Sequence, residues 1–273
     1  MKKIILLLSL AAIGCASQVT IKHDLRRTLP VIIDESTTGG QRFGAGFAGK
    51  TGSEQKATTE YYYTDAVNAT FESYEKSNAY GYLSFTPYPW FSIRAGLDDV
   101  GYCGDAIFRI SKPMNSAAGF LDLGLTRAAS ASLTGYANSS PSYYRIGLGG
   151  SVAPFSFGSD TCFNKKAARF RVYGSVTLTQ YPEWIDFSQS FNDSTGAAIE
   201  SWTIKTLVKG ETNIFTGGLS WEPGIFLFSL GAQRAFQTKE KGVRVDLGSQ
   251  PPYLVDTNPK SELRYLFKLG FRI

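Results

Sequence analysis

Residues 263–273, LRYLFKLGFRI, alternate between two kinds of side chain up to the last residue of the chain. One set is apolar, and it comprises Leu263, Tyr265, Phe267, Leu269, Phe271 and Ile273. The other set carries three cations, and it comprises Arg264, Leu266, Lys268, Gly270 and Arg272. Successive side chains of a β-strand point to opposite sides. The stretch therefore predicts a strand with one apolar and one cationic face.

The same period of two recurs along most of the chain. In each stretch, one face is apolar and the other is mostly polar, charged or glycine, as in 91–97, 120–125, 144–149, 170–178, 215–221 and 226–233. Segments of about ten residues with this alternation are typical of strands that cross a membrane. A soluble sandwich uses the same pattern with its apolar faces turned inward, so the pattern alone leaves both architectures open.

Short turns alternate with long polar stretches between these segments. Proline cannot donate a hydrogen bond to a strand ladder, so 86–90 (TPYPW) and 222–224 (EPG) predict tight reversals, as does 112–115. Longer polar connections are expected at 51–68, 126–140, 181–210 and 238–260. Bacterial outer-membrane barrels have short turns on the periplasmic side and long loops outside.

The predicted fold is all-β: an antiparallel up-and-down transmembrane β-barrel of about ten strands, with a range of 8–12. Residues 202–208 and 242–247 are candidates for additional strands. The ten expected strands lie near 41–50, 69–86, 90–98, 102–111, 117–126, 142–152, 168–180, 211–221, 225–237 and 261–273.

Residues 1–14 are predicted to be a signal peptide for export. Lys2 and Lys3 precede an apolar stretch, 4–13, that is too short to span a bilayer as a helix. Residues 12–15, AIGC, resemble the lipobox of bacterial lipoprotein precursors, which implies lipidation of Cys15. Ordinary cleavage after Gly14 is the alternative. Both alternatives export the chain.

Residues 15–40 are expected to be a periplasmic lead-in, followed by a barrel domain at 41–273. The lead-in holds His23 and the apolar run 31–33, which predicts either a short strand or a plug in the lumen.

With its signal peptide, the hairpin YLSFTPYPWFSIRAGL (82–97) and the aromatic last strand, the chain resembles bacterial outer-membrane β-barrel proteins as a broad class. The resemblance implies an outer-membrane location, contact with outer-membrane lipid and recognition of the last strand by the barrel insertion machinery. That class usually ends in Phe or Trp, whereas Ile273 is last here and Phe271 lies two residues earlier.

Composition gives no sign of catalysis. His23 is the only histidine in 273 residues, and no nucleophile elbow, P-loop or zinc-binding pattern is present. We therefore expect no enzyme activity, no cofactor and no metal site. The net charge of +5 is spread in ones and twos, so no nucleic-acid partner is expected. A disulfide between Cys103 and Cys162 stays open.

The strand periodicity turns a set of charged side chains toward the predicted lumen: Arg94, Arg109, Arg145, Arg171, Arg264, Lys268, Asp105 and Asp122. Buried charges must be paired or hydrated. One interpretation is a filled barrel closed by salt bridges, which suits a small strand number. The other is a narrow pore that prefers anions.

The function expected from these features is that of an integral outer-membrane barrel with a structural, adhesive or narrow-pore role. The alternative is a soluble ligand-binding β-barrel or β-sandwich lipoprotein tethered to the outer membrane. No residue pattern identifies a ligand.

Overall fold

The computed structural model describes residues 18–33, 43–63, 65–111, 117–129, 142–157, 168–192, 195, 197–236, 242–245, 253–256 and 263–272. Within these ranges, no helix is long and apolar enough to cross a membrane.

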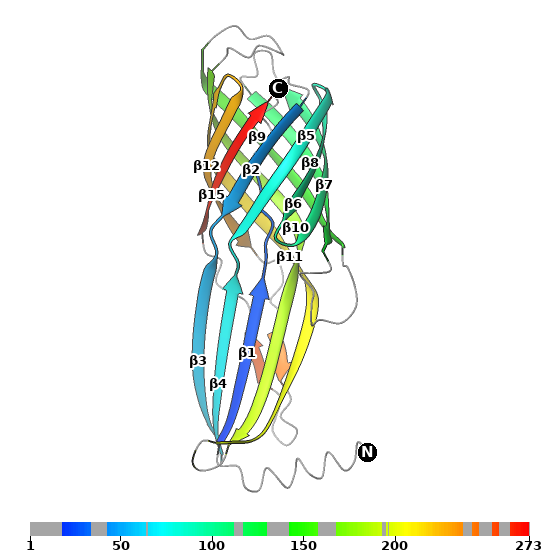
Figure 1. Ribbon diagram of the computed structural model, residues 1–273. Coiled ribbons are helices and arrows are strands. Elements are labelled where there is room, and N and C mark those ends of the chain that lie inside the picture. The colour runs from blue at the N-terminus through cyan, green and yellow to red at the C-terminus, as the bar shows by residue number, and fades with distance from the viewer. Residues whose placement is uncertain are drawn as a thin grey trace.

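Ten antiparallel strands close into a barrel (Figure 1). In order around the wall they are β2 (Phe43–Lys50), β5 (Asn78–Tyr88), β6 (Phe91–Asp98), β7 (Gly101–Ser111), β8 (Ala117–Ala128), β9 (Ser142–Phe157), β10 (Ala168–Asn192), β11 (Ala198–Pro223), β12 (Phe226–Phe236) and β15 (Leu263–Arg272). The wall closes where β15 pairs with β2, with Phe271 opposite Ala45. The predicted fold class and the count of ten barrel strands are confirmed.

The barrel is apolar outside and polar inside. Its outward side chains include Leu83, 68% exposed, and Leu230, 70% exposed. Its inward side chains include Arg94 and Arg171, only 2% and 1% exposed. The two faces of every barrel strand meet different surroundings, which is why the period of two is so regular in these segments.

The two ends of the barrel differ. We call one the turn end, because it holds the short β5–β6 and β11–β12 turns, the start of β2 and the end of β15. Gly224 in the β11–β12 turn has φ 63°, a conformation that glycine adopts without a Cβ clash. The opposite end, which we call the sheet end, continues into a second structure.

At the sheet end, β10 and β11 run on beyond the barrel and form an extended sheet with β1 (Gln18–Arg27), β4 (Asp65–Glu75) and β3 (Ser53–Tyr63). The strand order in this extension is β3-β4-β1-β10-β11 (Figure 1). β1 lies antiparallel to β10 and parallel to β4.

The extended sheet corrects three expectations. The polar stretches 51–68 and 181–210 are largely strands rather than loops, and residues 202–208 belong to β11. The single strand expected at 69–86 is two, because β4 and β5 are separated at Lys76 and Ser77. Pro182 fits within β10 because it lies between the last residue paired with β9, Thr179, and the first paired with β1, Glu183.

Two further segments differ from a simple barrel with a lead-in. Residues 242–247 contribute β13 (Gly242–Val245), which pairs only with β14 (Tyr253–Asp256) among the described strands. The lead-in is also not separate from the rest of the fold. Its first described part is β1, and Thr28–Ile33 then lies buried inside the barrel.

Candidate functional site

The barrel lumen is the part of the molecule where charged side chains converge. Its central cluster comes from four neighbouring strands, β6 to β9. Arg94 Nε contacts Asp105 Oδ2 at 2.7 Å, and Asp105 also pairs with Arg145. Asp122 Oδ2 lies 3.3 Å from Arg145 Nε and 3.6 Å from Arg94 Nη2. The Tyr80 hydroxyl donates to Asp105 Oδ2 at 3.2 Å. Two guanidinium groups and two carboxylates thus neutralise each other.

Strand register explains why this cluster can form. Asp105 pairs with Gly124 on β8, and Gly124 pairs in turn with Arg145 on β9. A Cβ atom at Gly124 would lie 3.1 Å from Arg145 Nε and would also collide with the Asp105 carboxylate. The missing side chain therefore lets Asp105 and Arg145 meet across the strand between them.

Two smaller clusters lie toward the ends of the lumen. Toward the turn end, Arg171 Nε lies 3.1 Å from Glu222 Oε1, and its Nη1 donates to Ser151 Oγ at 3.1 Å. At the sheet end, Glu75 is 2.5 Å from Lys50 Nζ and 3.3 Å from Arg264 Nη2.

The remaining two luminal candidates also point inward. Arg109 is half-buried, and its Nη1 donates to Ser92 Oγ at 2.5 Å. Lys268 is buried, and its Nζ lies 5.6 Å from the ring centre of Tyr82. All eight charged side chains named from the sequence thus line the interior.

Three further charged residues of the lumen were not predicted from the sequence: the carboxylates Glu75 and Glu222 and the cation Lys50. Glu222 follows Ser220 on the inward face of β11, so continuing that alternation into the turn would have found it. Glu75 had no such signal, because it ends a strand of the extended sheet.

The chain itself fills much of the lumen at the sheet end. We call Thr28–Ile33 the plug, because every residue in it is buried. Val31 and Ile33 belong to one apolar cluster with Tyr80 and Leu266 of the wall. Leu29 and Ile32 belong to another, with Tyr181 and Ile214. Of the two structures predicted for residues 31–33, the plug is the one observed.

Hydrogen bonds from the wall hold the backbone of the plug. Asn78 Nδ2 donates to the Leu29 carbonyl at 3.0 Å. Gln233 accepts from Ile32 N at 3.4 Å through Oε1 and donates to the Pro30 carbonyl at 3.3 Å through Nε2. An irregular buried segment needs such partners for its polar groups.

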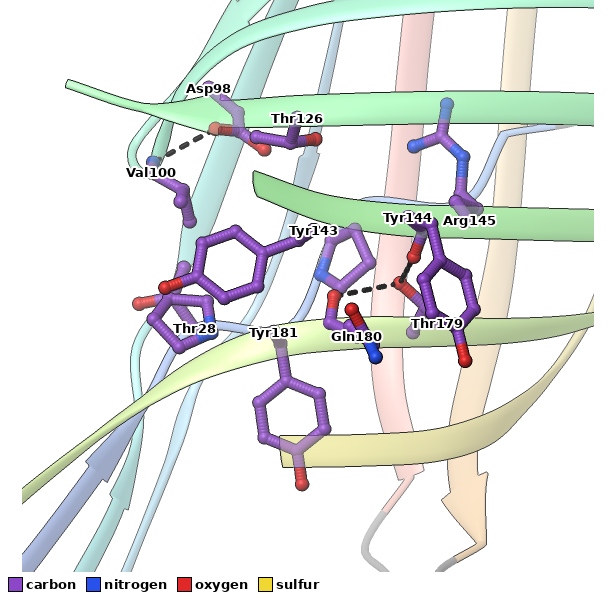
Figure 2. Close-up of a pocket in the computed structure, with 12 residues that line it drawn as sticks. Thr28, Asp98, Val100, Thr126, Tyr143, Tyr144, Arg145, Thr179, Gln180 and Tyr181 are labelled. Carbon is purple, nitrogen blue, oxygen red and sulfur yellow. Dashed lines mark hydrogen bonds between the residues drawn. The ribbon is translucent and has the colours of Figure 1, made fainter. Parts of the chain in front are cut away.

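A small pocket remains beside the plug (Figure 2). It has a volume of about 10 Å³, which is room for roughly one water molecule. Thr28 and Pro30 of the plug face Tyr143, Arg145 and Tyr181 of the wall there. A pocket of this size cannot hold an organic ligand.

Asp98, at the rim of this pocket, stabilises a turn. Its Oδ1 accepts from Val100 N at 2.8 Å and from Gly101 N at 2.9 Å, which closes the short β6–β7 connection. Among the described residues, no three His, Cys, Asp or Glu side chains are grouped to hold a metal ion.

The other residues named from the sequence lie elsewhere. His23 is in β1, opposite Phe187 of β10 and Phe71 of β4. Cys103 has a free, buried thiol 3.3 Å from Thr126 Oγ1. Cys15 and Cys162 lie outside the described residues.

Replacing Gln233 by leucine tests how the plug is held. The substitution leaves the Ile32 amide and the Pro30 carbonyl buried without Gln233, which costs about 1–3 kcal/mol for an unsatisfied group. We expect a matching loss in the free energy of unfolding, measured by urea titration in detergent micelles. Arg234→Leu, one residue along β12 on the exposed face, is the control and should change it far less. Equal losses would mean that Gln233 does not hold the plug.

Comparisons with known proteins return structural similarity only. No protein-family model matches the chain. No curated protein sequence matches it either. The N-terminal β-barrel domain of Pseudomonas aeruginosa OprF is similar with a TM-score of 0.30 and 8% identity, over 85% of this chain and 98% of that one.

Two other solved structures are similar at the same level. One is Ail, the attachment invasion locus protein of Yersinia pestis, in complex with the heparin analogue sucrose octasulfate. It has a TM-score of 0.24 and 10% identity, over 85% of this chain and 99% of that one. The translocator domain of the autotransporter NalP from Neisseria meningitidis has a TM-score of 0.27 and 12% identity, over 88% and 90%. The chain itself folds as a closed antiparallel barrel of ten strands.

Proposed function

We propose that this protein is an integral outer-membrane barrel that anchors the extended sheet at the cell surface, where the sheet has an adhesive role. The observation that carries the proposal is the reversed polarity of the barrel: apolar side chains cover its outside and paired charges fill its inside. A soluble ligand-binding barrel has the opposite arrangement, so the tethered soluble alternative has less support.

Aromatic side chains support a position in a bilayer. They gather on the outer surface at the turn end. The ring centres of Tyr88 and Trp90 are 5.5 Å apart there, and those of Trp221 and Phe228 are 5.7 Å apart. A second, smaller group at the sheet end includes Phe215 and Phe236, 4.9 Å apart. Aromatic girdles mark both interfaces of outer-membrane barrels, and outer-membrane lipid is accordingly the proposed neighbour of the exposed apolar belt.

The turn lengths support an orientation. Outer-membrane barrels keep their short turns in the periplasm and their long connections outside. The β5–β6 and β11–β12 turns lie at the turn end. The β10–β11 hairpin and the β3–β4 hairpin extend from the sheet end, which holds one short connection, β6–β7 (Figure 1). We therefore propose that the turn end faces the periplasm and the extended sheet faces the medium.

The edges of the extended sheet support an adhesive role. Within the described residues, β3 pairs only with β4, and residues 198–212 of β11 pair only with β10. Unpaired edge strands offer rows of backbone donors and acceptors to which an extended segment of another chain can add.

Sedimentation of cells tests the adhesive role. Cells that display the full chain should settle faster than cells that display a barrel with the β10–β11 extension, residues 183–208, replaced by a short Gly-Ser turn. Equal surface amounts of the two proteins are the control. Equal settling would leave the protein with an anchoring role only.

The filled lumen argues against the narrow pore. Arg94, Arg171 and Ile33 are 1–7% exposed, although a water-filled channel would expose the groups that line it. We expect no stepwise conductance when the purified protein is added to a planar lipid bilayer. Regular anion-selective steps would contradict this and restore the pore as the function.

A further inference from the structure

The N-terminal segment runs from the extended sheet into the barrel. β1 runs toward the barrel. Gln18 pairs with Asn192 at the far end of β10, and Arg27 pairs with Glu183 close to the barrel. The Arg27 carbonyl also accepts from Lys76 N at 3.1 Å, between β4 and β5. The chain therefore reaches the barrel from the extended sheet and enters it at the sheet end.

The chain next appears at the opposite end. The plug, Thr28–Ile33, lies inside the lumen, and β2 then starts with Phe43 at the turn end, opposite Phe85. The chain therefore passes from the sheet end of the lumen, at Ile33, to the turn end, at Phe43.

The position of β1 gives this route a structural reason. The β3–β4 hairpin grows from β2 and β5, and the β10–β11 hairpin grows from another part of the wall. Among the described pairings, these two hairpins are joined only through β1, which is parallel to one and antiparallel to the other. β1 can occupy this position only if it lies at the sheet end.

We infer that the N-terminal segment is threaded through its own barrel, so that β1 and the end of β15 lie at opposite ends of the wall. Arg272 ends β15 at the turn end, opposite Gly44. This step rests on the proposed orientation: with the turn end in the periplasm, β1 is displayed at the cell surface and the end of β15 faces the periplasm. The plug is the part of the displayed segment that remains in the lumen.

Cysteine labelling of intact cells tests the threaded path. Three exposed positions are each replaced by cysteine: Lys22→Cys in β1, Lys76→Cys at the sheet end and Pro89→Cys in the β5–β6 turn. Cells are treated with a maleimide that does not cross membranes, before or after permeabilisation. The modified residue is identified by mass spectrometry, so the native cysteines do not interfere.

Threading predicts that Lys22→Cys and Lys76→Cys are labelled on intact cells, whereas Pro89→Cys is labelled only after permeabilisation. Threading would be overturned if Lys22→Cys and Pro89→Cys became labelled under the same condition, intact or permeabilised, and Lys76→Cys under the other. Labelling of Pro89→Cys alone would support threading and overturn the proposed orientation, so the two failures are distinguishable.

Discussion

Replacing Asp105 by asparagine is expected to lower the free energy of unfolding by about 3–5 kcal/mol, the usual cost of removing one partner from a buried ion pair. Asp105 pairs with both Arg94 and Arg145, and all three side chains are at least nine-tenths buried. Asparagine has nearly the same shape but no charge, so one carboxylate, Asp122, would remain for two guanidinium groups. The measurement is a urea titration of the purified protein in detergent micelles.

Asp99→Asn is the matched control for this prediction. Asp99 is exposed in the β6–β7 connection, so the same loss of charge should change stability by less than about 0.5 kcal/mol. If both variants lost the same small amount, the central cluster would be hydrated rather than closed, and the picture of a filled lumen would be wrong.

Replacing Leu230 by arginine is expected to destabilise the barrel in lipid vesicles by about 2–4 kcal/mol, the cost of a cation near the middle of a bilayer. Leu230 lies near the middle of β12, opposite Phe267 of β15, and is 70% exposed. Its side chain is therefore a direct probe of the apolar belt. Reversible unfolding by urea in phospholipid vesicles measures the effect.

The control for the belt uses the same change at a different depth. Leu263, at the start of β15, is 53% exposed and lies at the sheet end. An arginine close to the interface costs only about 0–1 kcal/mol, so Leu263→Arg should be nearly neutral. Two near-neutral variants would show that no lipid surrounds β12 and would favour a soluble barrel.

The barrel could be predicted from the sequence because its strands separate two different surroundings. Phe267 and Lys268 are neighbours in β15, and they point to an apolar outside and a charged inside. Because of that contrast, apolar residues alternate with polar or small residues along each segment. It also assigned Asp105, Asp122 and the five arginines to the interior before any partner was known.

The extended sheet could not be predicted in the same way. Residues 53–60 of β3, SEQKATTE, contain no apolar face, so their sequence resembles a polar loop. The position of β1 between β4 and β10 depends on pairing with residues about 50 and 165 positions away, and no local pattern contains such partners. Glu75 was not predicted because it ends β4, a strand of the extended sheet, whereas its partners Lys50 and Arg264 belong to the barrel wall.

Insertion of the chain in the outer membrane as a folded barrel can be tested directly. Cells that produce it are fractionated, the membranes are washed with alkaline carbonate, and the retained protein is run on a gel with and without boiling. A membrane-spanning barrel should be retained in the outer-membrane fraction and should change its mobility after boiling. Release by carbonate, or one mobility under both conditions, would contradict a membrane-spanning barrel.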